Sequence, residues 1–506
     1  MKIKTTAENF HLLDPQQNEW VYNALDASVS TEVWEESSAT VQPHTYNTYN
    51  FVRGLQAPAM VMALRGISIN AEKRAQWIRQ LELRVAALQD SLDAMAHAVW
   101  DQPLNPRSTQ QLQTFFYKVM GIPPEYKYDR VKKERVITTD KAALEKLRDY
   151  FHARPIVNNI LRSRDLTKKI STLKSGVDAD LRMRTSYNVC GTETGRWSSN
   201  ENAFGSGTNL QNWTDELREI FEADVGTKIA YLDLEQAESR VVAYLSGDAN
   251  YIRACESGDL HTTVAMMVWP ELAWTDNPKA NRAVADQKFY QHWSYRDMAK
   301  RLGHGTNYRG KPFTMAKNIK VSQKVVELFQ DKYLRQAFPG IAEWHKKVAQ
   351  DLQLNGFLTT PLGRTRYFLK RLYDDDTLKE AIAFLPQSTI GEILNEGMYR
   401  LWYEMESAST KYPAKLLAQV HDAVLIQYPD LSDEHETATL ARAKELLQVP
   451  IPINGRQLII PVSCEGTGWN WRKHSDDNVY GLKKWTGHET RKWTKANSSF
   501  LDRVIL

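Results

Sequence analysis

Two aspartates lie in strongly apolar stretches of the sequence. Asp233 closes the run KIAYLDL, and Asp422 interrupts the run QVHDAVLI, which has the composition of one buried strand. An ionised carboxylate in such surroundings needs a compensating charge. Hard divalent cations such as Mg²⁺ prefer carboxylate oxygens, and a pair of them can clamp the attacking and leaving oxygens of a phosphoryl displacement. The two aspartates together indicate metal-dependent phosphoryl transfer, although each one alone also fits an ordinary acid at a strand end.

A second group of residues could hold phosphates and a base. In WSYRDMAKRLGHGTNYRG, cations and flat rings recur every four residues, at Arg296, Lys300, His304 and Tyr308. On a helix such residues share one face. Its cations could neutralise a triphosphate, and its rings could stack on a base. The packed face would consist of Tyr295, Met298 and Leu302. A basic helix facing solvent is the alternative.

A third stretch, residues 191–213, alternates glycines, hydroxyls and amides around Arg196. Such a stretch is normally a flexible loop, but its donors could also follow a nucleic-acid backbone or reach minor-groove acceptors. The basic segment at residues 162–176, RSRDLTKKISTLKSG, could add phosphate contacts.

The elements that must position these residues can be predicted from periodicity and from start and stop signals. Residues 71–100 keep the apolar spacing of one long helix, and Ser108 and Gly121 mark the ends of a shorter one. The chain changes from strand to helix just after Asp233. The segments LLAQVHDAVLIQY and LIIPVSCEGTGWNW predict further strands. Helices around a small sheet indicate an α+β fold.

Length and composition set the protein class. A chain of 506 residues with 42% hydrophobic and 25% charged residues indicates a globular protein with two to four compact regions. No run is long and apolar enough to span a membrane, and the N-terminus lacks a leader, so we expect a cytoplasmic protein. Three dispersed cysteines argue against disulfides and thiolate zinc sites. The net charge of +4 is compatible with a nucleic-acid partner.

Taken in order, the motifs resemble those of the family A DNA polymerases, the DNA polymerase I family, over about residues 55–474. DLEQAESR resembles motif A, RDMAKRLGHGTNY motif B and QVHDA motif C. The supporting matches are RSRDLTKKISTLKSG, TGRWSS, NLQNW, GFLTTPLGRTRYF, PQSTIGEIL and EGTGWNW. The resemblance implies a template-directed DNA polymerase that binds primer-template DNA and deoxynucleoside triphosphates.

The resemblance also implies residue roles. Asp233, Asp422 and the main-chain carbonyl of Leu234 would hold two Mg²⁺ ions, with Mn²⁺ as a substitute. The residues implied at the incoming nucleotide are Gln236, Glu238, His261, Arg296, Lys300, His304 and Tyr308. Among them Lys300 would also protonate the pyrophosphate, and Glu238 would exclude the ribose 2′-hydroxyl. The residues implied at the DNA are Arg196, Gln211, Gln387 and His421.

The implied architecture is a right hand, rich in helices, with a small antiparallel palm sheet. The expected boundaries are a thumb at 55–180, a palm at 181–240 and 381–474, and fingers at 241–380. An N-terminal segment at 1–54 and a basic aromatic tail at 475–506 would flank the hand. That tail could bind nucleic acid or a partner, or its rings could pack on the palm.

Four positions depart from the family pattern. His304 replaces the usual Phe or Tyr of motif B, and Arg309 stands where Gly is common. Ala423 replaces the usual Glu of motif C, and Lys379 stands where Arg is frequent. We therefore expect sugar discrimination at the nucleotide site to differ from that of typical members.

The front of the chain is short for this family. Tyr22 and Asp26 resemble the last exonuclease motif, YxxxD, but a plain amphipathic helix fits too, and no earlier exonuclease strand has room. We expect no intrinsic proofreading, and a leading segment that is a remnant or a docking region for a separate exonuclease or processivity protein. This compact layout favours a phage enzyme, which would act in the cytoplasm of a bacterial host.

Two other functions remain open from the sequence. A single-subunit RNA polymerase shares the palm and the His-Asp pair of motif C, but Glu238 argues against it. A non-catalytic DNA-binding replication protein could keep the polymerase fold, but retention of Asp233, Lys300 and Asp422 argues against that.

Overall fold

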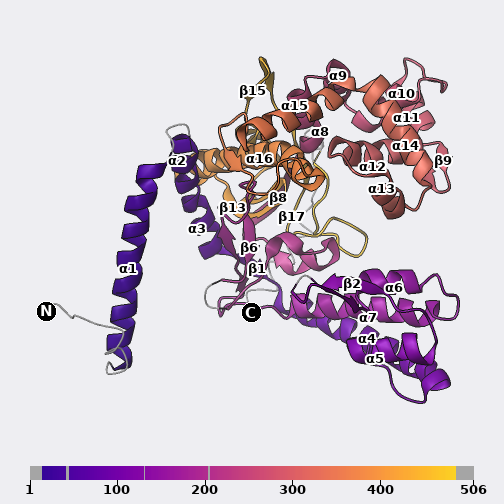
Figure 1. Ribbon diagram of the computed structural model, residues 1–506. Helices are drawn as coiled ribbons and strands as arrows, with labels where there is room; N and C mark the ends of the chain where they lie inside the picture. The colour runs from indigo at the N-terminus through magenta and orange to yellow at the C-terminus, as the bar shows by residue number, and fades with distance from the viewer. Residues whose placement is uncertain (1–13, 42–44, 130, 203–204, 409, 486–506) are drawn as a thin grey trace.

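The computed structural model describes residues 14–41, 45–129, 131–202, 205–408 and 410–485. At its centre is an antiparallel four-stranded sheet in the order β13-β14-β8-β17. Its strands are β8 (Thr227–Leu234), β13 (Lys415–Val420), β14 (Ala423–Pro429) and β17 (Val462–Gly468). Helices surround this sheet, so the predicted α+β class with a small antiparallel sheet is confirmed (Figure 1).

Both faces of the sheet are covered. Alternate residues of β8 enter different cores, with Ala230 and Leu232 in the larger one and Ile229 in a second one beside Trp471. Because neither face meets water, the strands read as continuous apolar runs rather than as an alternating pattern.

The prediction that QVHDAVLI is one strand with Asp422 in its middle is wrong. The run folds as a hairpin in which Val420 pairs with Ala423, and His421 and Asp422 form the turn. His421 has a φ of 55°. Two-residue hairpin turns need positive φ, and His tolerates this conformation better than most side chains. Continuous burial on both sides of the turn hid it from the hydrophobic pattern.

Helices from three parts of the chain pack on the larger core. They are α8 (Ala237–Ser246), α16 (Asp375–Leu401) and α17 (Asp433–Leu447). The long helix α16 contacts both of the others, and its buried residues include Phe384, Ile390 and Ile393. Since α8 begins directly after β8, its first turn lies at the end of that strand.

A second group of helices forms the upper right of the molecule in Figure 1. Its members are α9 (Ala249–Glu256), α10 (Leu260–Val268), α11 (Pro278–Ala285), α12 (Tyr295–Asn307), α13 (Pro312–Ile319), α14 (Gln323–Asp331) and α15 (Pro339–Asn355). The expected basic helix is α12. It starts at a capping box of Ser294 and Asp297, and Met298 and Leu302 form its buried face, as predicted.

A third group of helices lies at the lower right in Figure 1. It comprises α4 (Ala71–Trp100), α5 (Thr109–Gln113), a π-helical turn (Thr114–Val119), α6 (Lys141–Leu147) and α7 (Arg154–Leu173). The predicted long helix over 71–100 is confirmed, and the Ser108 side chain accepts from Gln111 N–H as a cap. This group packs around its own core, which includes Leu92, Phe116 and Ile160.

The N-terminal helices are α1 (Pro15–Thr40), α2 (Tyr46–Gly54) and α3 (Gln56–Arg65). In Figure 1, α1 stands apart from the rest of the molecule. Among its residues only Val21 is buried, and Trp34 stacks on Tyr49 of α2 with ring centroids 5.5 Å apart. The polar stretch SSATVQPHTYNTYN, residues 37–50, ends α1 and begins α2, and its residues 42–44 lie outside the described part.

Short antiparallel pairings complete the fold. The strands are β1 (Ile67–Ile69) with β4 (Arg182–Met183) and β7 (Phe221–Glu222), β2 (Tyr126–Asp129) with β3 (Glu134–Ile137), β5 (Ser186–Asn188) with β6 (Ser198–Asn200), β9 (Lys288–Tyr290) with β10 (Trp293–Ser294), β11 (Phe357–Thr359) with β12 (Thr365–Tyr367) and β15 (Ile451–Ile453) with β16 (Arg456–Leu458). In the tail, Trp485 packs against the larger core; residues 486–506 of the predicted basic aromatic tail lie outside the described residues. No helix in the described ranges has the length and apolarity to cross a membrane.

Candidate active site

The two aspartates meet where β8 ends against the hairpin. Asp233 pairs with Ala423, so the preceding residue, Asp422, lies beside the end of β8. The backbone N–H of Leu234 donates to the carbonyl oxygen of Asp422 at 3.1 Å. Both carboxylate residues line one cavity of about 760 Å³. The predicted convergence of Asp233 and Asp422 is therefore present in the structure.

Negative charge dominates around Asp233. Burial, followed by the charges of Glu465, Asp422 and Glu235, raises the pKa of its carboxyl to about 7, against a smaller opposing effect of Lys473. Glu465 sits at a bulge in β17, next to Ser463, which pairs with Asp233. Bulges of this kind can re-aim a side chain toward a site. An excess of carboxylates over cations around Asp233 fits a divalent ion at this position.

Protein side chains alone do not complete a metal site here. In the part of the chain that the structure describes, no three His, Cys, Asp or Glu side chains converge as a metal-binding group. One or two carboxylates supplemented by substrate phosphates is the usual arrangement for Mg²⁺. Asp233, Asp422 and the Leu234 carbonyl fit that pattern.

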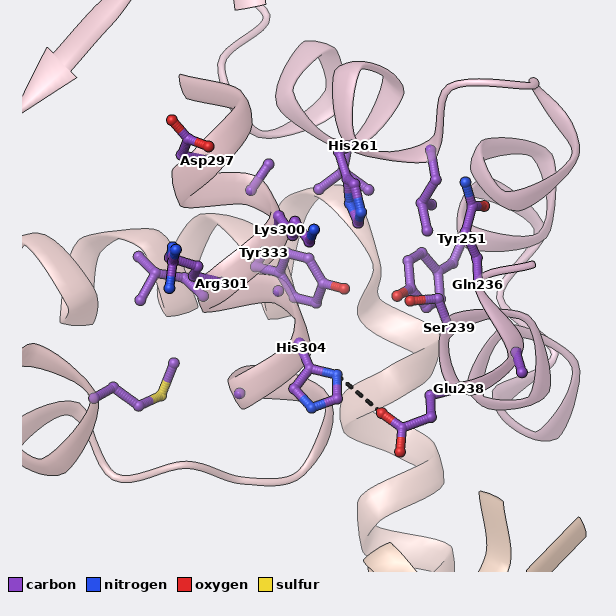
Figure 2. Close-up of a pocket in the computed structure, with 18 of the residues that line it drawn as sticks. Gln236, Glu238, Ser239, Tyr251, His261, Asp297, Lys300, Arg301, His304 and Tyr333 are labelled. Atoms are coloured by element: carbon purple, nitrogen blue, oxygen red, sulfur yellow. Dashed lines mark ion pairs between the residues drawn. The ribbon is translucent and has the colours of Figure 1, made fainter. Parts of the chain in front are cut away.

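A chain of charged contacts extends from Asp422 to α12. Arg196 Nη2 lies 3.0 Å from Asp422 Oδ1 and 3.7 Å from Glu238 Oε1. The other oxygen of Glu238 lies 3.2 Å from His304 Nδ1, the contact that Figure 2 marks with a dashed line. Side chains from a loop, α8, α12 and the hairpin turn are thus joined at one edge of the cavity.

The loop that carries Arg196 is tightly fixed. Gly195 has a φ of 73°, and a Cβ there would lie 2.5 Å from Arg364 Cζ. Asn395 on α16 donates to the Gly195 carbonyl at 3.3 Å, and Gly391 on the same helix approaches the Arg196 side chain. Glycine at position 195 therefore suits both the positive φ and the close approach of Arg364, which directly precedes β12.

The side chains on the predicted face of α12 lie in two different environments. Lys300 and His304 line the cavity (Figure 2), whereas Arg296 points to Asp259, with Nη2 and Oδ1 3.1 Å apart. Tyr308 follows the helix as its C-cap, and burial raises its pKa strongly.

His261 reaches the cavity from α10, opposite Lys300 (Figure 2). Burial, together with the nearby cations Arg296 and Lys300, lowers its pKa to about 4. The imidazole is therefore neutral at pH 7. Sequence reasoning found His261 only through the family resemblance.

The remaining predicted residues lie at different distances from the cavity. Gln236 lines it and begins α8 with a φ of 54°. Gln211 donates to Gln419 Oε1 at 2.6 Å, and Gln419 in turn donates to the His421 carbonyl. Gln387 is half-buried on α16, one turn before Gly391. Gln211, Gln387 and His421 thus lie outside the cavity lining.

Two positioning residues escaped the sequence analysis. Asp259 caps α10 through Thr262 N–H and also holds Arg296. Asn307, buried at the end of α12, donates to the Tyr251 hydroxyl and accepts from the Tyr333 hydroxyl. The cap of Asp259 could be predicted from its place before a helix. The other contacts join residues too far apart in sequence for any local signal.

Two of the departures from the family pattern meet at one acid. Arg309 and Lys379 both contact Asp375, at 3.5 and 2.8 Å, and Lys311 adds a third contact at 3.0 Å. Of these cations, Lys379 and Lys311 lower the pKa of Asp375 to about 2. The end of α12 is thereby tied to the start of α16.

Comparison with known proteins supports the resemblance. The model of DNA polymerase family A matches residues 75–473. DNA polymerase I, thermostable, of Thermus aquaticus is 29% identical over 438 residues, which are 83% of this chain and 47% of that protein. DNA polymerase I of Treponema pallidum is 26% identical over 443 residues, 84% of this chain and 40% of that protein. The chain thus spans less than half the length of these relatives.

A solved structure has the same fold. It is described as the POL domain of Pol1 from M. smegmatis in complex with DNA primer-template and dNTP, and it matches with a TM-score of 0.65 and 23% identity. The match covers 82% of this chain and 69% of that one. The chain belongs to DNA polymerase family A, and its fold is that of the polymerase domain.

Proposed function

We propose that this chain is a template-directed DNA polymerase that adds deoxynucleotides to a primer 3′-hydroxyl. The observation that carries the proposal is the adjacency of Asp233 and Asp422 on a cavity that Lys300 and His261 also line. The cavity thus combines acids, which attract metal ions, with Lys300 and His261, which attract phosphates. The related structure, whose description names a primer-template and a dNTP, supports the choice of substrates.

Asp233, Asp422 and the carbonyl of Leu234 would hold two Mg²⁺ ions, for which Mn²⁺ can substitute. The ions, when bound, neutralise charge on the reacting phosphate and activate the primer hydroxyl. The chain contributes the fixed spacing of the two carboxylates, which the backbone bond between Leu234 and Asp422 maintains.

The cations of α12 would bind the triphosphate. Lys300 lies on the cavity wall and would protonate the departing pyrophosphate. Arg296 would contact the phosphates from its place beside Asp259, and neutral His261 would donate a hydrogen bond. Such binding works through positioning and charge neutralisation.

Other residues would recognise the sugar, the base and the primer. Glu238 and Gln236 line the cavity at the start of α8, where Glu238 would exclude a 2′-hydroxyl. His304 and Tyr308 would stack near the new base pair. The proposed contacts to the primer end are Arg196, Gln211, Gln387 and His421.

We assign the parts of a right hand as follows. Residues 55–180 would form the thumb, 181–240 and 381–474 the palm, and 241–380 the fingers, followed by the tail at 475–506. The separate core of the lower helical group, from Leu92 to Ile160, supports the central part of the thumb assignment, whereas Leu55, Ala59 and Met62 belong to the larger core.

The N-terminal segment, residues 1–54, would not proofread. Tyr22 and Asp26 are exposed on α1 and do not line the cavity. The exposed apolar side chains of α1, which include Tyr22, Leu25 and Val29, would instead dock a separate exonuclease or processivity protein.

Primer extension by the purified chain tests the proposal. With Mg²⁺, a primed template and each nucleotide set in turn, we expect template-directed incorporation of deoxynucleotides. Preferential incorporation of ribonucleotides would instead identify an RNA polymerase. Failure to extend any primer with Mg²⁺ or Mn²⁺ would identify a non-catalytic DNA-binding protein.

A further inference from the structure

Glu238 is held from both sides at the edge of the cavity. Its Oε2 lies 3.2 Å from His304 Nδ1 on α12, and its Oε1 lies 3.7 Å from Arg196 Nη2. Figure 2 shows the His304 ring turned toward this carboxylate. The Glu238 side chain is only 23% exposed, whereas that of His304 is 55% exposed. The orientation of Glu238 is therefore fixed by two donors from different parts of the chain.

The closer of the two donors is the histidine. A histidine Nδ1 can donate a hydrogen bond to a carboxylate in two states of the ring. These are the neutral tautomer that carries its proton on Nδ1 and the imidazolium. The Arg196 guanidinium is shared, since the same Nη2 lies 3.0 Å from Asp422 Oδ1. Without His304, the carboxylate would retain only the longer contact, and it would be drawn toward Arg196.

The neighbouring tyrosine does not take this role. Tyr308 packs edge to face on His304, with ring centroids 5.2 Å apart. Its hydroxyl is buried and makes no hydrogen bond to any described residue. Of the two rings near Glu238 on this face of α12, His304 is the one that contacts it.

We propose that His304 is a positioning residue that orients the Glu238 carboxylate and thereby sets the sugar selectivity of the site. The inference rests on the proposed polymerase function. To exclude a ribose 2′-hydroxyl, the Glu238 carboxylate must stay in one position. A carboxylate that moves away leaves room for the extra oxygen. The histidine supplies that constraint through the 3.2 Å contact of its Nδ1 with Glu238 Oε2.

The test is a double-mutant cycle read as a ratio. For each variant, kcat/KM for a deoxynucleotide is divided by kcat/KM for the matching ribonucleotide. We expect Glu238→Ala and His304→Ala each to lower this ratio by about tenfold or more, within the coupling range of contacting side chains. The ratio of the double variant should lie within about twofold of the ratio of Glu238→Ala alone. Both single changes remove the same interaction, so their effects should not add.

A conservative variant separates positioning from packing. In His304→Asn, the amide nitrogen can occupy the place of Nδ1, so the ratio should stay nearer the wild-type value than in His304→Ala. His304→Ser provides a second truncation if the alanine variant does not fold. A ratio that is unchanged in both truncations, or effects of His304 and Glu238 that multiply in the double variant, would overturn the inference.

The outcomes also separate this inference from the proposed function. If the wild-type chain extends primers but Glu238→Ala keeps full discrimination, the polymerase assignment stands and the positioning role of His304 is wrong. If the wild-type chain extends no primer with either metal ion, both are wrong.

Discussion

The backbone N–H of Leu234 donates a hydrogen bond to the carbonyl oxygen of Asp422, and this bond of 3.1 Å joins the end of β8 to the turn between β13 and β14. The carboxylates of Asp233 and Asp422 are therefore placed by main-chain pairing, not by contact with each other. Replacing either side chain should leave the sheet intact. The chemistry of the site can thus be tested by substitutions that do not disturb the fold.

The raised pKa of Asp233, about 7, predicts a pH-dependent stability for the metal-free protein. Unfolding returns this carboxyl to an ordinary pKa near 3.9. The folded state therefore binds the proton more tightly. Below about pH 4 this proton stabilises the folded state by roughly 2–4 kcal/mol, and the stabilisation is lost as the pH rises toward 7. Denaturant unfolding in a chelator should show this loss in the wild type and not in Asp233→Asn. Parallel pH profiles for the two proteins would contradict it.

The same pKa predicts proton release on metal binding. Below pH 7, Asp233 must lose its proton before a cation binds, so the affinity for Mn²⁺ or Mg²⁺ should fall by up to about tenfold per pH unit. Calorimetry in buffers of different ionisation enthalpy measures the released proton directly. Equal affinity at pH 5.5 and pH 8 would argue against a cation at Asp233.

Gly195→Ala should destabilise the loop that carries Arg196. The new Cβ would lie 2.5 Å from Arg364 Cζ at a φ of 73°, so both contact and backbone are strained. Gly121→Ala is the matched control, because it has a φ of 66° and no atom near its added Cβ. We expect a loss of roughly 1 kcal/mol for the control and more for Gly195→Ala. Equal losses in chemical denaturation would show that Arg364 does not restrain the loop.

Asp259 combines a helix cap with a charge pair, and two variants separate these contributions. Asp259→Ala removes the acceptor for Thr262 N–H as well as the partner of Arg296, and should cost about 1–2 kcal/mol of unfolding free energy. Asp259→Asn keeps a capping oxygen and loses only the charge, so its cost should be clearly smaller. Thermal or denaturant melts that rank the two variants the other way would contradict this account of α10.

Much of the site could be predicted from the sequence because its signals are local. The change from strand to helix after Asp233 is a change of period, and the buried face of α12 repeats every three to four residues. The family motifs then indicated which of these segments belong to the polymerase site. Conversely, the turn at His421 and Asp422 was missed because both flanking strands are buried on two faces, which removes the polar break that usually marks a hairpin.

The contacts that tune the site could not be predicted. His304 and Glu238 lie on different helices, and Arg296 on α12 contacts Asp259, the residue that caps α10; nothing in the local sequence pairs them. A helix around Tyr22 and Asp26 was one interpretation of the sequence, but the full extent of α1, Pro15–Thr40, was not predicted. Its Asp14 capping box is local, but its apolar residues are mostly exposed, so no buried stripe marks it.

The absence of proofreading is a separate prediction. The purified chain should leave a mismatched primer 3′ end intact when nucleotides are withheld, because Asp26 is exposed on α1 and no metal-binding group accompanies it among the described residues. Gel analysis of a labelled primer measures this. Shortening of the primer that disappears in Asp26→Ala would show that an exonuclease site is present.

The most direct test of the central claim is primer extension by Asp233→Asn and Asp422→Asn beside the wild type. Each variant keeps the size of the side chain and the backbone pairing but removes one negative charge from the pair. We predict that extension falls by about a hundredfold to a thousandfold, as expected when a group that supports transition-state charge is lost. Primer-template affinity, which depends mainly on phosphate contacts elsewhere, should change little. Extension at a rate near that of the wild type in either variant would contradict a catalytic role for the two aspartates.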